Sequence, residues 1–244
     1  MIQFGPVLTF ILTVLWIAAI TNAINLIDGL DGLVGGVSII SLMTMGVISY
    51  FFLYDTDIFL TMTIFVLVAA IMGFFPYNYH PAIIYLGDTG ALFIGFMIGV
   101  LSLQGLKNAT AVAILSPVII LGVPIVDTVV AIVRRKLSGR SAMEADKMHL
   151  HHRLLAMGFT HRGAVLVVYA IAILFSLIAL LLNVSSRLGG ILLLLSLILG
   201  MEILIEGLEI WGVGRTPLFN FLKFIGNSDY RQAIMLKWKQ GRKK

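Results

Sequence analysis

The segment "NAINLIDGLDGLVGG", residues 22–36, places two aspartates, two asparagines and four glycines between long apolar stretches. The chain is 59% hydrophobic and only 12% charged, and its mean hydropathy is +1.03. A soluble domain is close to half apolar and about a quarter charged, so the composition indicates an integral membrane protein. Carboxylates between apolar segments of such a protein are costly and point to a function.

Seven apolar stretches approach the length of about 20 residues that crosses the hydrocarbon core of a bilayer. They lie at 4–21, 36–54, 58–75, 89–106, 110–133, 163–183 and 188–206. Because lipid cannot hydrogen-bond a free backbone, each stretch is expected to be helical. The predicted fold is all-α: a polytopic transmembrane helix bundle of about seven spans over 1–206, followed by a basic tail over 207–244. The glycines of the fourth stretch predict close helix packing; they are Gly90, Gly95, Gly99 and Gly105.

The distribution of lysine and arginine predicts the orientation. Of the 17 such residues, seven lie in 134–162 and eight in 207–244, and only Lys107 and Arg187 lie elsewhere. By the positive-inside rule the two basic segments are cytoplasmic and the N-terminus is outside, in a multi-pass protein of the plasma membrane. The net charge of +5 is then explained by topology and anionic lipid, and nucleic acid is not an expected partner.

Counted back from this orientation, three polar segments share the cytoplasmic face: "NAINLIDGLDGL" (22–33), "YLGDTG" (85–90) and "HLHHRL" (149–154). In the first segment Asn22, Asn25, Asp28 and Asp31 recur every three residues, so much of the set can share one face of a helical turn. The alternative is a helix terminus with acid caps and Asx turns. Polar groups in apolar surroundings favour the functional interpretation.

The other two segments each allow more than one interpretation. Asp88 in "GDTG" can cap a helix, worth about 1 kcal/mol, or hold a hard cation beside a phosphate. The third segment supplies a guanidinium group and imidazole nitrogens, which can hydrogen-bond a phosphate. Its residues are His149, His151, His152 and Arg153. Its alternatives are topogenic charge beside lipid headgroups and a zinc site, which the spacing fits poorly.

Three further acids lie within or at the end of apolar stretches. Asp127 in "PIVDT" is interpreted as a site residue near the membrane surface, or as the ion-pair partner of Arg134 or Arg135. Glu202 and Glu206 are equally consistent with the exit of the last helix and with chemistry.

Four motifs in order, "NAINLIDGLDGL", "YLGDTGALFIGF", "PIVDT" and "HLHHRL", resemble those of the polyprenyl-phosphate N-acetylhexosamine-1-phosphate transferases. The sequence is most similar to the bacterial undecaprenyl-phosphate N-acetylglucosamine-1-phosphate branch, which initiates the synthesis of cell-wall polymers such as teichoic acid or lipopolysaccharide O-antigen. The branch that uses UDP-N-acetylmuramoyl-pentapeptide shows three consecutive histidines where Leu150 interrupts them here.

The resemblance implies a Mg²⁺-dependent exchange, with Mn²⁺ as an alternative ion, in which UDP-N-acetylglucosamine and a lipid phosphate give a lipid-diphosphate-sugar and UMP. It implies that Asp28, Asp31 and Asp88 are catalytic, and that Asp88 with Asn25 binds the metal. Binding of the nucleotide-sugar and its phosphates would involve Asn22, Asn25, Asp127, His149, His151, His152 and Arg153. The expected partners are the UDP-sugar, the polyprenyl-phosphate lipid and the membrane, with a homodimer as a further candidate.

The chain departs from the family at one point. Members carry an Asp-Asp pair in an early cytoplasmic loop and about four more N-terminal spans, and this chain has no Asp-Asp pair. It is therefore expected to be an N-terminally shortened member, with an inactive fragment that needs its missing half as the alternative to an active enzyme. A membrane transporter is the third hypothesis, disfavoured because the polar motifs lie at span ends on one face.

Overall fold

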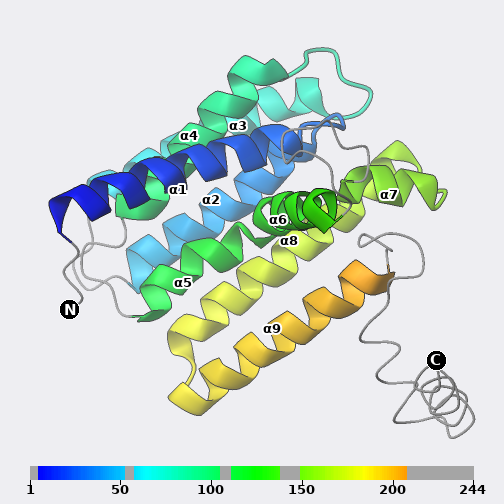
Figure 1. Ribbon diagram of the computed structural model, residues 1–244. Coiled ribbons are helices and arrows are strands. Elements are labelled where there is room, and N and C mark those ends of the chain that lie inside the picture. Colours follow the sequence, from blue (N-terminus) through cyan, green and yellow to red (C-terminus); the bar gives the residue numbers. More distant parts are fainter. Residues whose placement is uncertain (1–4, 53–57, 105–110, 138–148, 208–244) are drawn as a thin grey trace, which may run out of the picture.

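The computed structural model describes residues 5–52, 58–104, 111–137 and 149–207, and all regular structure in this part of the chain is helical (Figure 1). The helices are α1 (Pro6–Leu26), α2 (Leu33–Phe51), α3 (Ile58–Asn78), α4 (Gly87–Gln104), α5 (Ala111–Ile120), α6 (Gly122–Leu137), α7 (Leu150–Ala156), α8 (His161–Val184) and α9 (Arg187–Gly207). This confirms the all-α prediction. The basic tail lies outside the described residues.

Six of these helices are long and apolar enough to cross a membrane, namely α1, α2, α3, α4, α8 and α9. The seventh expected span, 110–133, differs from the prediction because it divides into α5 and α6. Pro124 has no N–H to donate to the carbonyl of Ile120 four residues earlier, and a helix loses one hydrogen bond at such a position. The Ser41 hydroxyl of α2 lies 3.5 Å from that carbonyl and donates to it instead.

Helix α2 occupies the centre of the bundle. It packs against α3 on one side and α8 on the other, while α1 pairs with α4 and α5 pairs with α8 (Figure 1). Helix α9 lies at the edge, against α8. The end of α1, the start of α2, the end of α3 and the starts of α4 and α8 therefore lie at one end of the bundle (Figure 1).

The pairing of α1 with α4 depends on small residues. A Cβ atom at Gly95 would lie 2.9 Å from Cα of Thr21, and one at Gly99 would lie 3.3 Å from Cα of Ile17. A side chain at Gly95 would force the two backbones apart, and one at Gly99 would require a shift of a few tenths of an ångström. This confirms the close packing predicted for the fourth apolar stretch at these two glycines; Gly105 lies outside the described residues.

Gly95→Ala is expected to lower Tm by several degrees in detergent, because the added methyl group must push the α1 backbone away, at about 1–3 kcal/mol. Gly73→Ala is the matched control, since its Cβ meets no atom within 4 Å and alanine is the better helix former. Equal Tm values for the two variants would contradict the α1–α4 packing.

Candidate active site

The "DGLD" loop joins α1 to α2 and begins the site. Helix α1 ends at Leu26 and α2 begins at Leu33, with Gly32 as its N-cap at φ +77°. A residue with a Cβ atom rarely adopts this conformation. The chain therefore reverses direction within six residues and leaves Asp28 and Asp31 at the end of the bundle.

Asp88 reaches the same place from the start of α4. The helix begins at Gly87, so Asp88 lies in its first turn. Its Oδ1 accepts a hydrogen bond of 3.4 Å from Nδ2 of Asn25, at the end of α1. The structure thus brings together the two residues expected to bind the metal, although they are 63 positions apart in sequence.

Asp28 lies in a region of negative charge. Burial raises the pKa of its carboxyl, and the nearby carboxylates of Asp88 and then Asp31 raise it further, to about 6. A divalent cation would relieve this repulsion. Carboxylate and amide oxygens are the donors that Mg²⁺ and Mn²⁺ prefer, so Asp28, Asp88 and Asn25 fit such an ion.

The histidine segment is anchored from within α6. Asp127 is buried, and its Oδ2 lies 2.9 Å from Nδ1 of His149 while its Oδ1 accepts a 2.8 Å hydrogen bond from the Leu150 N–H. These bonds satisfy a carboxylate that would otherwise be expensive in apolar surroundings. Asp127 therefore fixes the start of α7, which carries the remaining histidines.

His151 connects this segment to the "DGLD" loop. Its side chain is buried, and its ring lies so close to Gly29 that a Cβ atom there would overlap it. Burial, and next the neighbouring His152, lower the pKa of His151 to about 4. The ring is thus neutral at pH 7, so it offers hydrogen bonding rather than the charge that a cationic cluster would supply.

Nε2 of His151 is buried and has no hydrogen-bond partner among the described residues. A buried ring nitrogen without a partner is uncommon, and a bound ligand could supply one. His152 is exposed and Arg153 is half-buried on the same short helix.

The Asn22 side chain bonds within its own helix. It is exposed, and its Nδ2 donates to the carbonyl of Ala18 in its own helix, at 2.7 Å. Its role in binding stays a prediction.

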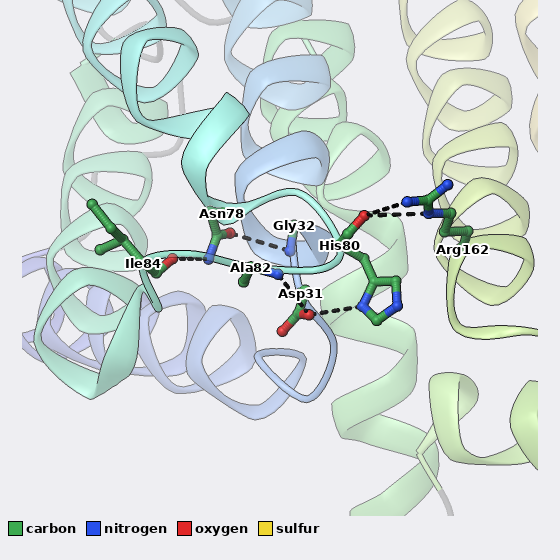
Figure 2. Close-up of polar contacts among 7 residues, drawn as sticks. All are labelled: Asp31, Gly32, Asn78, His80, Ala82, Ile84 and Arg162. Carbon is green, nitrogen blue, oxygen red and sulfur yellow. Dashed lines mark hydrogen bonds and ion pairs between the residues drawn. The ribbon is translucent and has the colours of Figure 1, made fainter.

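Asp31 belongs to a group that the sequence analysis missed (Figure 2). Its Oδ2 lies 2.8 Å from Nδ1 of His80 and accepts a 3.2 Å hydrogen bond from the Ala82 N–H. Burial raises the pKa of Asp31, but these two hydrogen bonds, together with the electrostatic attraction of His161 and His80, outweigh burial and hold the pKa below its usual range. Asp31 is therefore ionised at neutral pH, and Nδ1 of His80 is the donor.

Two residues of α8 complete this group. The ring of His161 stacks on that of His80 with centroids 4.0 Å apart, and Arg162 donates to the His80 carbonyl through Nε (3.2 Å) and Nη2 (3.0 Å). Asp31, His80 and His161 bring potential metal-ligand atoms within 4.8 Å of one another. In the sequence, the features that could have indicated this group are the "HP" dipeptide before "GDTG" and the "HR" pair at the start of an apolar stretch.

An apolar cavity of about 120 Å³ lies between α6, α8 and α9. Asp127 and Leu150 line it together with apolar side chains such as Phe175 and Leu197, and Gly200 of α9 also borders it. The cavity is therefore continuous with the residues that hold the histidine segment.

Comparison with known proteins identifies relatives of this sequence. Residues 1–106 match the sequence model of glycosyl transferase family 4. A probable undecaprenyl-phosphate N-acetylglucosaminyl 1-phosphate transferase of Bacillus subtilis is 46% identical over 196 residues, which cover 80% of this chain and 54% of that protein.

Two further relatives match shorter segments. A decaprenyl-phosphate N-acetylglucosaminephosphotransferase of Mycolicibacterium smegmatis is 47% identical over 43% of this chain and 29% of its own length. An undecaprenyl-phosphate alpha-N-acetylglucosaminyl 1-phosphate transferase of Salmonella typhimurium is 34% identical over 53% of this chain and 36% of its own length. The chain thus spans about half the length, or less, of these curated relatives.

Millimolar Mg²⁺ is expected to raise Tm of the purified chain at pH 7, and Asp88→Asn should abolish most of this shift, because it removes a ligand and a charge. The shift should weaken at pH 5, where Asp28, with a pKa of about 6, is largely protonated and binds cations poorly. Differential scanning fluorimetry at constant ionic strength measures both effects. Glu202→Gln, at the end of α9, is the control, and an equal Mg²⁺ shift in Asp88→Asn would contradict the site.

Proposed function

Because the chain belongs to glycosyl transferase family 4, we propose that it transfers N-acetylglucosamine 1-phosphate from UDP-N-acetylglucosamine to undecaprenyl phosphate and releases UMP. The observation that carries the proposal is the convergence of the "DGLD" loop, Asp88 and the histidine segment at one end of the bundle. The names of the three relatives specify a polyprenyl phosphate and N-acetylglucosamine phosphate. The product would be the first membrane-bound intermediate of a cell-wall polymer of the teichoic acid or O-antigen type.

In this reaction a phosphate oxygen of the lipid attacks the sugar-linked phosphorus of the UDP-sugar. The bond from that phosphorus to the oxygen bridging it to the uridine phosphate breaks, and UMP leaves with this oxygen. Both reactants are anions, so the protein contributes mainly by positioning them and neutralising charge. Mg²⁺, when held by Asp88, Asn25 and Asp28, would supply the positive charge.

The histidine segment would bind the phosphates. Since His151 is neutral and its Nε2 has no partner among the described residues, the tautomer protonated at Nε2 can donate to a phosphoryl oxygen. His149 would act through its bond to Asp127, which holds the start of α7. His152, which is exposed, and Arg153, which is half-buried, would contact the outer phosphate oxygens.

The apolar cavity would receive part of the polyprenyl chain. It lies between helices, two of which are long enough to cross a membrane, and it borders Asp127 and Leu150. A lipid phosphate seated there would present its headgroup beside the histidine segment. The soluble UDP-sugar would enter from the cytoplasm, the side to which the positive-inside rule assigns the basic segments.

The direct test measures UMP release by the purified chain from UDP-N-acetylglucosamine, with and without undecaprenyl phosphate. Release that requires both the lipid and Mg²⁺, and that Asp88→Asn lowers by at least about 100-fold, is the expected result. Release without lipid, or an unaffected Asp88→Asn variant, would contradict the proposal.

The same assay tests the lipid site. Gly200→Phe should raise KM for undecaprenyl phosphate about tenfold and leave KM for the UDP-sugar unchanged, because the ring would enter the cavity from a position whose Cβ meets no atom within 4 Å. Gly73→Phe, equally open but not part of the cavity lining, is the control. Identical KM values for undecaprenyl phosphate in the two variants would show that the polyprenyl chain binds outside this cavity.

A further inference from the structure

We propose that Asp31 and His80 are positioning residues that hold the α3–α4 loop, residues 79–86, and thereby set the place of Asp88 relative to Asn25. The inference rests on the proposed function for the reaction that this placement serves. It gives the two aspartates of "DGLD" different tasks and assigns a role to His80 and Arg162.

The loop is tied first to the beginning of α2. Asn78 is buried at 5% exposure; its Oδ1 accepts a 3.1 Å hydrogen bond from the Gly32 N–H, and its Nδ2 donates to the Ile84 carbonyl at 3.0 Å (Figure 2). One side chain thus joins the start of α2 to the far part of the loop. Ile83 and Ile84 also donate their N–H groups to the carbonyl of Tyr77, at 2.8 and 3.0 Å.

Asp31 holds the middle of the loop. A single oxygen, Oδ2, accepts from both the His80 ring and the Ala82 N–H (Figure 2). Hydrogen bonds to a charged acceptor are stronger than neutral ones. This oxygen therefore faces the loop, whereas the carboxylate of Asp28 is repelled by that of Asp88.

His80 links the loop to α8. Its ring bonds to Asp31, and its backbone carbonyl accepts two hydrogen bonds from Arg162 (Figure 2). The same ring also stacks on that of His161. The loop is thus held between the start of α2 and the start of α8. Both of these helices belong to the packed bundle.

The position of the loop determines the position of Asp88. The loop ends at Leu86, α4 begins at Gly87, and Asp88 meets Asn25 across a 3.4 Å contact. A displacement of about 1 Å at a reacting centre can cost about 100-fold in rate. Loss of the Asp31–His80 bond is therefore expected to act on turnover through Asp88.

The test compares paired variants of both residues. The amide nitrogen of His80→Asn lies close to the place of Nδ1 and can still donate to Asp31, whereas His80→Ala removes the donor. Asp31→Asn keeps a carbonyl oxygen that can accept from the loop, whereas Asp31→Ala removes it. Two properties are measured on the purified chain: hydrogen–deuterium exchange of the amides of 79–86 without substrate, and the rate of UMP release.

Both alanine variants should exchange the loop amides at least about tenfold faster and release UMP about 100-fold more slowly. Each asparagine variant should show near-wild-type exchange and at least about tenfold more activity than its alanine partner. Asp88→Asn is the control, since it should lose turnover without faster exchange in the loop.

Three results would overturn the proposal. Equal inactivity of Asp31→Asn and Asp31→Ala with wild-type loop exchange would show that Asp31 acts directly on substrate or metal. Faster loop exchange with unchanged turnover would show that the loop does not position Asp88. Stoichiometric Zn²⁺ that is lost in His80→Ala and His161→Ala but kept in Asp88→Asn would show a metal site instead.

Failure of the proposed function remains distinguishable from failure of this inference. If the wild-type chain releases no UMP, the proposed function fails, and the Mg²⁺-induced shift in Tm replaces turnover in the comparison. Asp31→Ala and His80→Ala should then reduce that shift, and a shift equal to that of the wild type would overturn the inference.

Discussion

A carboxylate at the end of a membrane-spanning helix must be solvated or bonded, and this requirement organises one end of the bundle. The four aspartates described there differ in how they meet it. Asp127 is buried and bonded to His149 and Leu150, Asp31 is bonded to His80 and Ala82, and Asp88 is exposed beside Asn25. The ionised form of Asp28 is destabilised, since burial and neighbouring carboxylates raise its pKa to about 6.

These differences separate supporting aspartates from those that we propose to bind a cation. Asp127 and Asp31 each join a polar segment to the bundle, so their hydrogen bonds stabilise the placement of other residues. The carboxylates of Asp28 and Asp88 instead repel each other, an arrangement that favours a bound cation. Structural support and the proposed cation binding thus fall to different aspartates.

The sequence predicted the fold class and the convergence of the polar segments, because apolar length and the order of the spans are local properties. It did not predict the division between α5 and α6, which depends on the missing N–H of Pro124 and on Ser41 from another helix. Nor did it predict the Asp31–His80–Arg162 group, whose members meet only through tertiary packing. Asn22, which its regular spacing groups with the other three residues, donates its Nδ2 to Ala18 of its own helix, and its role at the site stays a prediction.

The central claim is that Asp28, Asp88 and Asn25 form the cation site on which substrate binding depends. The most direct measurement is an anomalous-difference map from crystals of the chain grown with Mn²⁺ and UDP. The account predicts a Mn²⁺ peak within bonding distance of Asp88 and Asn25, next to the diphosphate. A peak among Asp31, His80 and His161, or bound UDP with no peak beside Asp88, would contradict it.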